Sequence, residues 1–197
     1  MVTEINENGF VKASPCGGID ARTLADTLLC LQNNPDITGV VCCMPPHLSD
    51  GKEDKAMPTD KIWVDFGLPY DEVNKLISFG DMLTFASKPA NLLNGRIVAP
   101  CLDNRCGVAS LVKCAELLKD NETDYKVIIP YQLEPIAGRT GTNADHISIS
   151  GKGVKTAVVS IPQRYMHTQN EVISVADVDN TAKLIAEYIK CGGAFND

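Results

Sequence analysis

The sequence lacks any apolar run that approaches the roughly 18 residues of a membrane span. Its opening stretch, Met1 to Gly9, is too acidic and polar for a secretory signal peptide. Positive charge is also scarce, with 18 Lys and Arg against 25 Asp and Glu and a net charge of -7. Because nucleic acid and anionic membrane surfaces attract basic proteins, we expect neither as a main partner. These features predict a cytoplasmic protein.

No Cys-x-x-Cys pair occurs among the eight cysteines, so a structural zinc cluster is not expected. The cysteines lie in apolar runs such as Val40-Val-Cys-Cys-Met44, which predicts reduced and mostly buried thiols rather than a disulfide framework. The Lys of a phosphate-binding P-loop is missing from Gly138-Arg-Thr-Gly141. That segment is therefore interpreted as a glycine-bearing turn.

What the sequence does have is enough apolar material for a core, with 44% hydrophobic residues in 197. Its first half is dense in short apolar runs separated by turn residues such as Asn33-Asn-Pro35, a pattern typical of strands. Residues 70–77 instead have the acidic start and apolar spacing of a short helix. We predict a small β-rich domain over residues 1–94, with strands at 9–13, 39–44, 61–65 and 81–87.

The second half, residues 95–197, alternates strand-like and helix-like segments. Strands are predicted at 96–99, 126–129 and 154–161. A first helix is predicted to bury Val108, Leu111, Val112, Ala115 and Leu118. A last helix is predicted to bury Val178, Ala182, Ile185 and Ile189, with Ser174 at its start and Gly192-Gly193 after its end. This alternation predicts an α/β fold with a reduced, mostly parallel sheet layer.

Two polar side chains stand where apolar runs end. Asp103 lies in Leu102-Asp-Asn-Arg-Cys-Gly107, and His167 closes Arg164-Tyr-Met-His167. A carboxylate and an imidazole placed in this way are candidate metal ligands. Alternatives remain open, because a loop Asp before an apolar helix is often its cap, and a lone His is more often a surface residue. The case for His167 depends on the preceding Arg-Tyr and on Glu171 after it.

Several motifs in the same order resemble the glutamyl-aminopeptidase and cellulase-M-like family of two-metal aminopeptidases, the tetrahedral aminopeptidase type. The motifs are Gly17-Gly-Ile-Asp20, Pro45-Pro-His-Leu48, Trp63-Val-Asp-Phe-Gly67, Leu102–Gly107, Gly138–Asp145 and Arg164–His167. The resemblance implies a hydrolase that removes N-terminal residues from peptides with Zn²⁺ or Co²⁺. It also implies that residues 1–94 are a β-barrel or PDZ-like apical domain, and that the chain forms a homo-oligomer or joins a full-length relative.

The sequence also departs from the family pattern. The family uses a His-x-Asp motif, a bridging Asp, a Glu-Glu pair, a further Asp and a final His, of which only Asp103 and His167 are plainly matched. The sequence begins after the first motif, and a segment is missing between Lys126-Val-Ile128 and Ile129-Pro-Tyr-Gln-Leu-Glu134. We therefore expect at most one metal ion and weak or lost catalysis.

The join at residues 128–129 permits two registers. In the first, residues 129–134 are a later strand and Glu134 has no metal role. In the second, Leu133 takes the general-base position of the Glu-Glu pair and Glu134 takes the ligand position. The 31 residues from Asp103 to Glu134 (134 minus 103) leave room for a helix and a returning strand. Asp103, Glu134 and His167 could then bind one Zn²⁺ with an open fourth position.

Three hypotheses follow for the function. The first is a metal-dependent aminopeptidase with impaired catalysis, since Leu133 cannot accept a proton. The second is a non-catalytic relative that acts as an assembly or regulatory subunit. The third is a truncated remnant whose exposed apolar surface favours aggregation or a partner.

His146, in Asn143-Ala-Asp-His146, is an alternative metal ligand that the spacing does not require.

Overall fold

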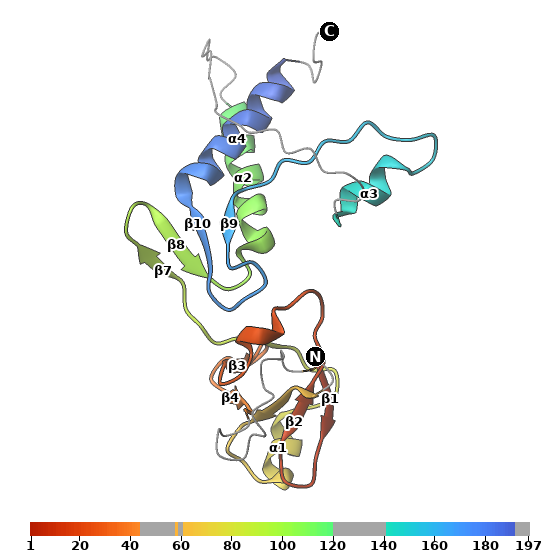
Figure 1. The fold of residues 1–197 in the computed structure, drawn as a ribbon, viewed down its shortest axis with the longest axis vertical. Coiled ribbons are helices and arrows are strands. Elements are labelled where there is room, and N and C mark those ends of the chain that lie inside the picture. The colour runs from red at the N-terminus through yellow and green to blue at the C-terminus, as the bar shows by residue number, and fades with distance from the viewer. Residues whose placement is uncertain (44–57, 59–60, 120–140, 192–197) are drawn as a thin grey trace. The chain divides into compact units, whose positions relative to one another are not determined.

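The computed structural model describes residues 1–43, 58, 61–119 and 141–191 (Figure 1). The chain divides into two compact units. The first contains Met1–Asp103 and Gln163–Ile173, and the second contains Asn104–Pro162 and Ser174–Asp197. The domain boundary predicted between residues 94 and 95 stays a prediction. No helix among the described residues is long and apolar enough to cross a membrane.

The first unit contains a six-stranded sheet in which all neighbouring strands are antiparallel. Its strands, in chain order, are β1 (Val2–Ile5), β2 (Val11–Ala13), β3 (Leu28–Leu31), β4 (Thr38–Val41), β5 (Trp63–Asp65) and β6 (Leu83–Phe85). The spatial order is β1-β2-β5-β4-β3-β6. Each of the four strands predicted in residues 1–94 overlaps an observed one, whereas β1 and β3 were not predicted. The buried pattern of β3 lacks the alternation that marks a half-buried strand.

The curled sheet and one short helix enclose the core of this unit. Residues two apart on a strand share a face, so Leu29 and Leu31 both point into the interior. The helix α1 (Tyr70–Leu76) begins after Pro69, and its Val73 is fully buried against that interior. The core residues are Val2, Val11, Ala13, Leu24, Leu29, Leu31, Val41, Ile62, Val64, Val73 and Ile77. The helix predicted at 70–77 is thus confirmed.

A second sheet has the order β7-β8-β10-β9, formed by β7 (Ala90–Leu92), β8 (Arg96–Ala99), β9 (Gln163–Arg164) and β10 (Glu171–Ser174). Strands β7 and β8 pair antiparallel, as do β9 and β10. Asn94 and Gly95 make the first hairpin turn with φ values of 58° and 63°. The mostly parallel sheet predicted from the alternation of elements is not confirmed: β7 with β8, and β9 with β10, form hairpins whose short turns permit only antiparallel pairing.

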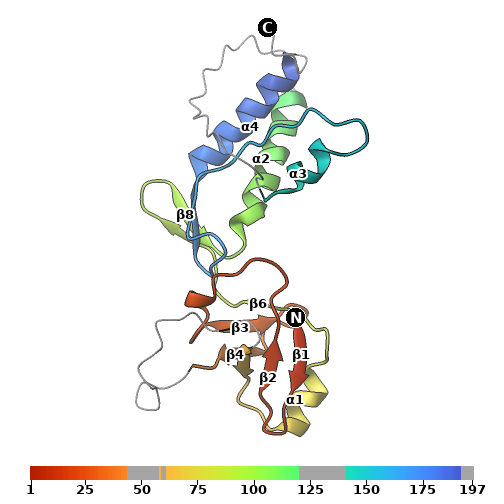
Figure 2. The same ribbon diagram turned by 45° about the vertical axis from the view of Figure 1, so that its right-hand side comes forward.

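The second unit is built on two helices, α2 (Leu102–Lys119) and α4 (Val175–Lys190), which lie side by side in both views (Figures 1 and 2). A short helix, α3 (Asn143–Ser148), follows Thr142, whose hydroxyl oxygen accepts the Ala144 N–H. The contact between α2 and α4 uses the small side chains of Cys114, Ala182 and Ala186. Both long helices occur where the sequence predicts them.

Four of the five α2 positions predicted on its buried face are exposed, and the fifth, Leu118, is partly buried against the cluster of Cys114, Ala182 and Ala186. Val108, Leu111 and Val112 are 60%, 58% and 57% exposed, because α2 turns Cys106, Ser110 and Cys114 inward instead. Ile189 near the end of α4, also predicted as buried, is 50% exposed.

The strand predicted at residues 154–161 does not form either. Val154 and Val158 are both 48% exposed in an irregular segment. A strand needs a neighbour for its backbone N–H and C=O groups, and no strand in the described part of the chain pairs with this one. The strand predicted at 126–129 lies outside the described residues.

Candidate metal site

The structure brings Asp103 and His167 together although they are 64 residues apart in the sequence. Asp103 is in the first turn of α2, and His167 is in the turn between β9 and β10. The His167 Nε2 lies 3.1 Å from the Asp103 Oδ2. Both side chains remain accessible, at 45% and 36% exposure. The helix-cap alternative for Asp103 does not hold, since the residue lies inside the helix.

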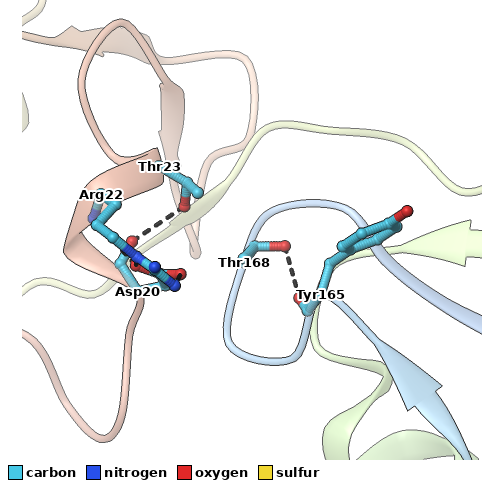
Figure 3. A network of polar contacts seen from close by, with 5 residues as sticks. All are labelled: Asp20, Arg22, Thr23, Tyr165 and Thr168. Carbon is cyan, nitrogen blue, oxygen red and sulfur yellow. Dashed lines mark hydrogen bonds and ion pairs between the residues drawn. The ribbon is translucent and has the colours of Figure 1, made fainter.

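The backbone around this pair is unusual. Cys101, just before α2, has φ 56°, and His167 itself has φ 65°. Positive φ is costly for residues other than glycine, so such positions persist only where their surroundings hold them. In the His167 turn, the Thr168 hydroxyl donates to the Tyr165 carbonyl at 2.7 Å (Figure 3). The turn is therefore fixed by its own hydrogen bonds.

Glu171 connects the two candidate ligands through their main chains. Glu171 is buried, at 2% exposure. Its Oε2 accepts the backbone N–H of Asp103 at 3.0 Å, and its Oε1 accepts the backbone N–H of His167 at 2.7 Å. The sequence marks Glu171 only as a neighbour of His167. Its contact with Asp103 depends on tertiary structure, and no local sequence pattern predicts this contact.

The N-terminal segment also holds His167 in place. The Asp20 N–H donates to the His167 carbonyl at 3.0 Å. Gly18 packs against the imidazole so closely that a Cβ there would lie 2.9 Å from ring atoms Cε1 and Nδ1. A side chain at residue 18 would displace the ring. The motif Gly17-Gly-Ile-Asp20 thus has a spatial role beside His167.

The Asp20 carboxylate itself is engaged elsewhere. Its two oxygens accept hydrogen bonds from Arg22 Nε at 2.8 Å and Nη2 at 2.7 Å. Figure 3 shows the side chains of Asp20 and Arg22 lying against each other. The side-chain hydrogen bond from Arg22 lowers the pKa of Asp20 to about 2. The Asp20 carboxylate is therefore charged at neutral pH and paired with Arg22 rather than turned to the Asp103–His167 pair.

The donor chemistry of the pair suits a divalent metal ion. Two ligand atoms about 2.1 Å from a tetrahedral zinc ion are separated by about 3.4 Å, close to the observed 3.1 Å. A third ligand is needed, and the described residues contain no group of three or more His, Cys, Asp or Glu side chains able to hold a metal. Glu171 uses both oxygens on backbone amides, and the predicted third ligand, Glu134, lies outside the described residues.

The sequence pattern of the M42 glutamyl aminopeptidases matches residues 1–129 and 126–184. The chain belongs to this family. The two matched segments meet at residues 126–129, where the sequence predicts a missing segment. The lysyl aminopeptidase of Pyrococcus furiosus is 26% identical, over 93% of this chain and 76% of its own. The family and this relative indicate a metal-dependent aminopeptidase, in agreement with the resemblance seen in the motifs.

Solved structures of M42-like aminopeptidases share the fold. The TET aminopeptidase of a marine-sediment Thaumarchaeota archaeon superposes with a TM-score of 0.83 at 18% identity, over 96% of this chain and 77% of that one. The TET1 peptidase of Pyrococcus horikoshii has a TM-score of 0.73 at 19% identity, over 94% and 78%, and can assemble into a tetrahedron or a large octahedral shell. The mixed α/β fold with curled antiparallel sheets is thus that of the TET aminopeptidases.

Proposed function

We propose that this chain is a metal-dependent aminopeptidase that binds one divalent ion, Zn²⁺ or Co²⁺, between Asp103 and His167. What supports this is the 3.1 Å approach of two partly exposed side chains of metal-binding type, in a chain of this family. Glu134 is proposed as the third ligand, which commits to the second register of residues 129–134. The bound ion would polarise a peptide carbonyl and lower the pKa of a water molecule.

The proposed activity is weak. Peptide hydrolysis needs a carboxylate that takes a proton from the attacking water and gives it to the leaving amine. In the register that makes Glu134 a ligand, the residue at this position is Leu133, which has no titratable group. Loss of a positioned base typically lowers the rate by about 10²–10⁴-fold.

Calorimetric titration with Zn²⁺ and Co²⁺ tests the site. We expect the wild-type chain to bind one equivalent of metal, and Asp103→Ala, His167→Ala and Glu134→Ala each to lose at least tenfold in affinity. Each substitution removes one of three ligands, and no other described cluster of His, Cys, Asp and Glu replaces it.

The matched control is His146→Ala. His146 is an exposed histidine on α3 and an alternative ligand by sequence, so its removal should leave the affinity unchanged. Retained affinity in Glu134→Ala, with loss in the other two variants, would favour the first register. Absence of binding by the folded wild-type chain would contradict the metalloenzyme and leave the non-catalytic assembly subunit as the better proposal.

We also propose that the chain associates with copies of itself. The TET1 peptidase that shares its fold forms large shells, and α2 exposes a contiguous apolar row at Val108, Leu111 and Val112. Size-exclusion chromatography with light scattering should give a mass of at least twice 21.2 kDa. The double variant Leu111→Glu/Val112→Lys should shift that mass toward the monomer if this row takes part. A monomer at every concentration of wild type would reject self-association.

A further inference from the structure

Glu171 is a buried carboxylate that the proposed chemistry does not use. Moving a charged carboxylate out of water is costly unless hydrogen bonds replace the lost solvation. Glu171 is 2% exposed, and its two oxygens each accept one backbone N–H. Hydrogen bonds of this charge-assisted kind are stronger than neutral ones. The carboxylate is thus built into the fold through two specific amides.

Those two amides belong to Asp103 and His167 themselves. The Asp103 N–H is one of the N-terminal groups of α2 that have no partner within the helix, and a negative charge is favoured there. The His167 N–H lies in a turn with positive φ. A hydrogen bond to a residue's own amide restricts the direction of its Cα–Cβ bond, so one carboxylate orients two side chains.

Glutamate is the residue type that this arrangement requires. A carboxylate offers two acceptor oxygens and can receive both N–H groups, whereas a glutamine amide offers one acceptor and one donor group. In Glu171→Gln one of the two amides would face an NH₂ group. The two candidate ligands would then lose their common anchor, while the size of the buried side chain is kept.

We propose that Glu171 is a positioning residue that sets the 3.1 Å approach of Asp103 and His167 by holding both of their backbone amides. Its consequence for metal affinity rests on the proposed function. The hydrogen bonds that join the backbone amides of Asp103 and His167 through Glu171 do not depend on it, because they exist without a metal. The effect of Glu171 on metal affinity and its hydrogen bonds to the two amides can therefore be tested separately.

In calorimetric titration of the full chain, Glu171→Gln should weaken Zn²⁺ binding by about 10–100-fold, the loss seen when hydrogen-bond partners of metal ligands are removed. The visible spectrum of the Co²⁺-loaded protein should change as well, because it reports the ligand geometry. Binding and spectrum equal to wild type would overturn the proposal.

Thr168→Val is the matched control. Thr168 is buried in the same turn, and its hydroxyl donates to the Tyr165 carbonyl at 2.7 Å and accepts the Asn170 N–H at 3.2 Å. It touches neither ligand amide. If Thr168→Val weakened Zn²⁺ binding as much as Glu171→Gln does, the stability of the turn would explain both effects and Glu171 would have no positioning role.

The NMR chemical shifts of the amide protons in the metal-free protein are the second measurement, and they test the positioning role without metal. Both the Asp103 and the His167 signals should move upfield in Glu171→Gln, and the Asp103 signal should stay in place in Thr168→Val. Unmoved signals in Glu171→Gln would overturn the positioning role whatever the metal result. If the signals move as expected while wild type binds no metal, the proposed function fails and the positioning role of Glu171 stands.

Discussion

We expect the substitution Leu133→Glu to raise the rate of aminoacyl-substrate hydrolysis by about 10²–10⁴-fold in the presence of Zn²⁺ or Co²⁺. Leu133 lies outside the described residues, so this expectation depends on sequence. The register that makes Glu134 a metal ligand puts Leu133 at the first position of the family's Glu-Glu pair. A carboxylate there would supply the group that, in the proposed function, is needed to carry the proton from water to the leaving amine.

The measurement is turnover of a panel of aminoacyl p-nitroanilides, since the sequence does not define the preferred N-terminal residue. Leu133→Gln is the matched control, because it is polar and similar in size but cannot accept a proton. The double variant Leu133→Glu/His167→Ala should be inactive, which separates real turnover from a contaminating peptidase. Equal rates for Leu133→Glu and Leu133→Gln would reject the register and Glu134 as a ligand.

A large loss of stability is expected from Leu31→Ala. Leu31 is 1% exposed on β3 and packs in the core cluster with Val2, Val11 and Ile77. Replacing a buried leucine by alanine removes its burial and leaves a cavity, at a typical cost of about 2–5 kcal/mol of unfolding free energy. Urea unfolding followed by the fluorescence of Trp63, the single tryptophan, reports on this sheet directly.

Leu28→Ala is the control for this prediction. Leu28 lies on the same strand but is 54% exposed, so the same chemical change should alter the unfolding free energy by no more than about 0.5 kcal/mol. Equal losses for the two variants would mean that the interior of the sheet is not packed around Leu31.

Much of the local structure could be predicted from the sequence. The helices α1, α2 and α4 and four strands of the large sheet follow from apolar spacing and turn residues, which act over a few neighbours. The direction of strand pairing in the second sheet could not be predicted from the sequence. An alternation of strands and helices is compatible both with parallel strands joined by crossovers and with separate hairpins. The buried face of α2 could not be predicted either, because its apolar residues cover more than one face of the helix.

The candidate site, too, could be predicted from the sequence only in part. Asp103 and His167 are recognisable by residue type and by the family motifs around them, and the join near residue 128 is visible in the order of those motifs. The tertiary structure alone decided that their side chains approach within 3.1 Å, that Glu171 holds both amides, and that Gly18 packs on the imidazole. The sequence determines which chemical groups are present and which local elements carry them. Contacts between segments 64 or more residues apart depend on which strands and helices become neighbours, and that is settled by packing over the whole unit.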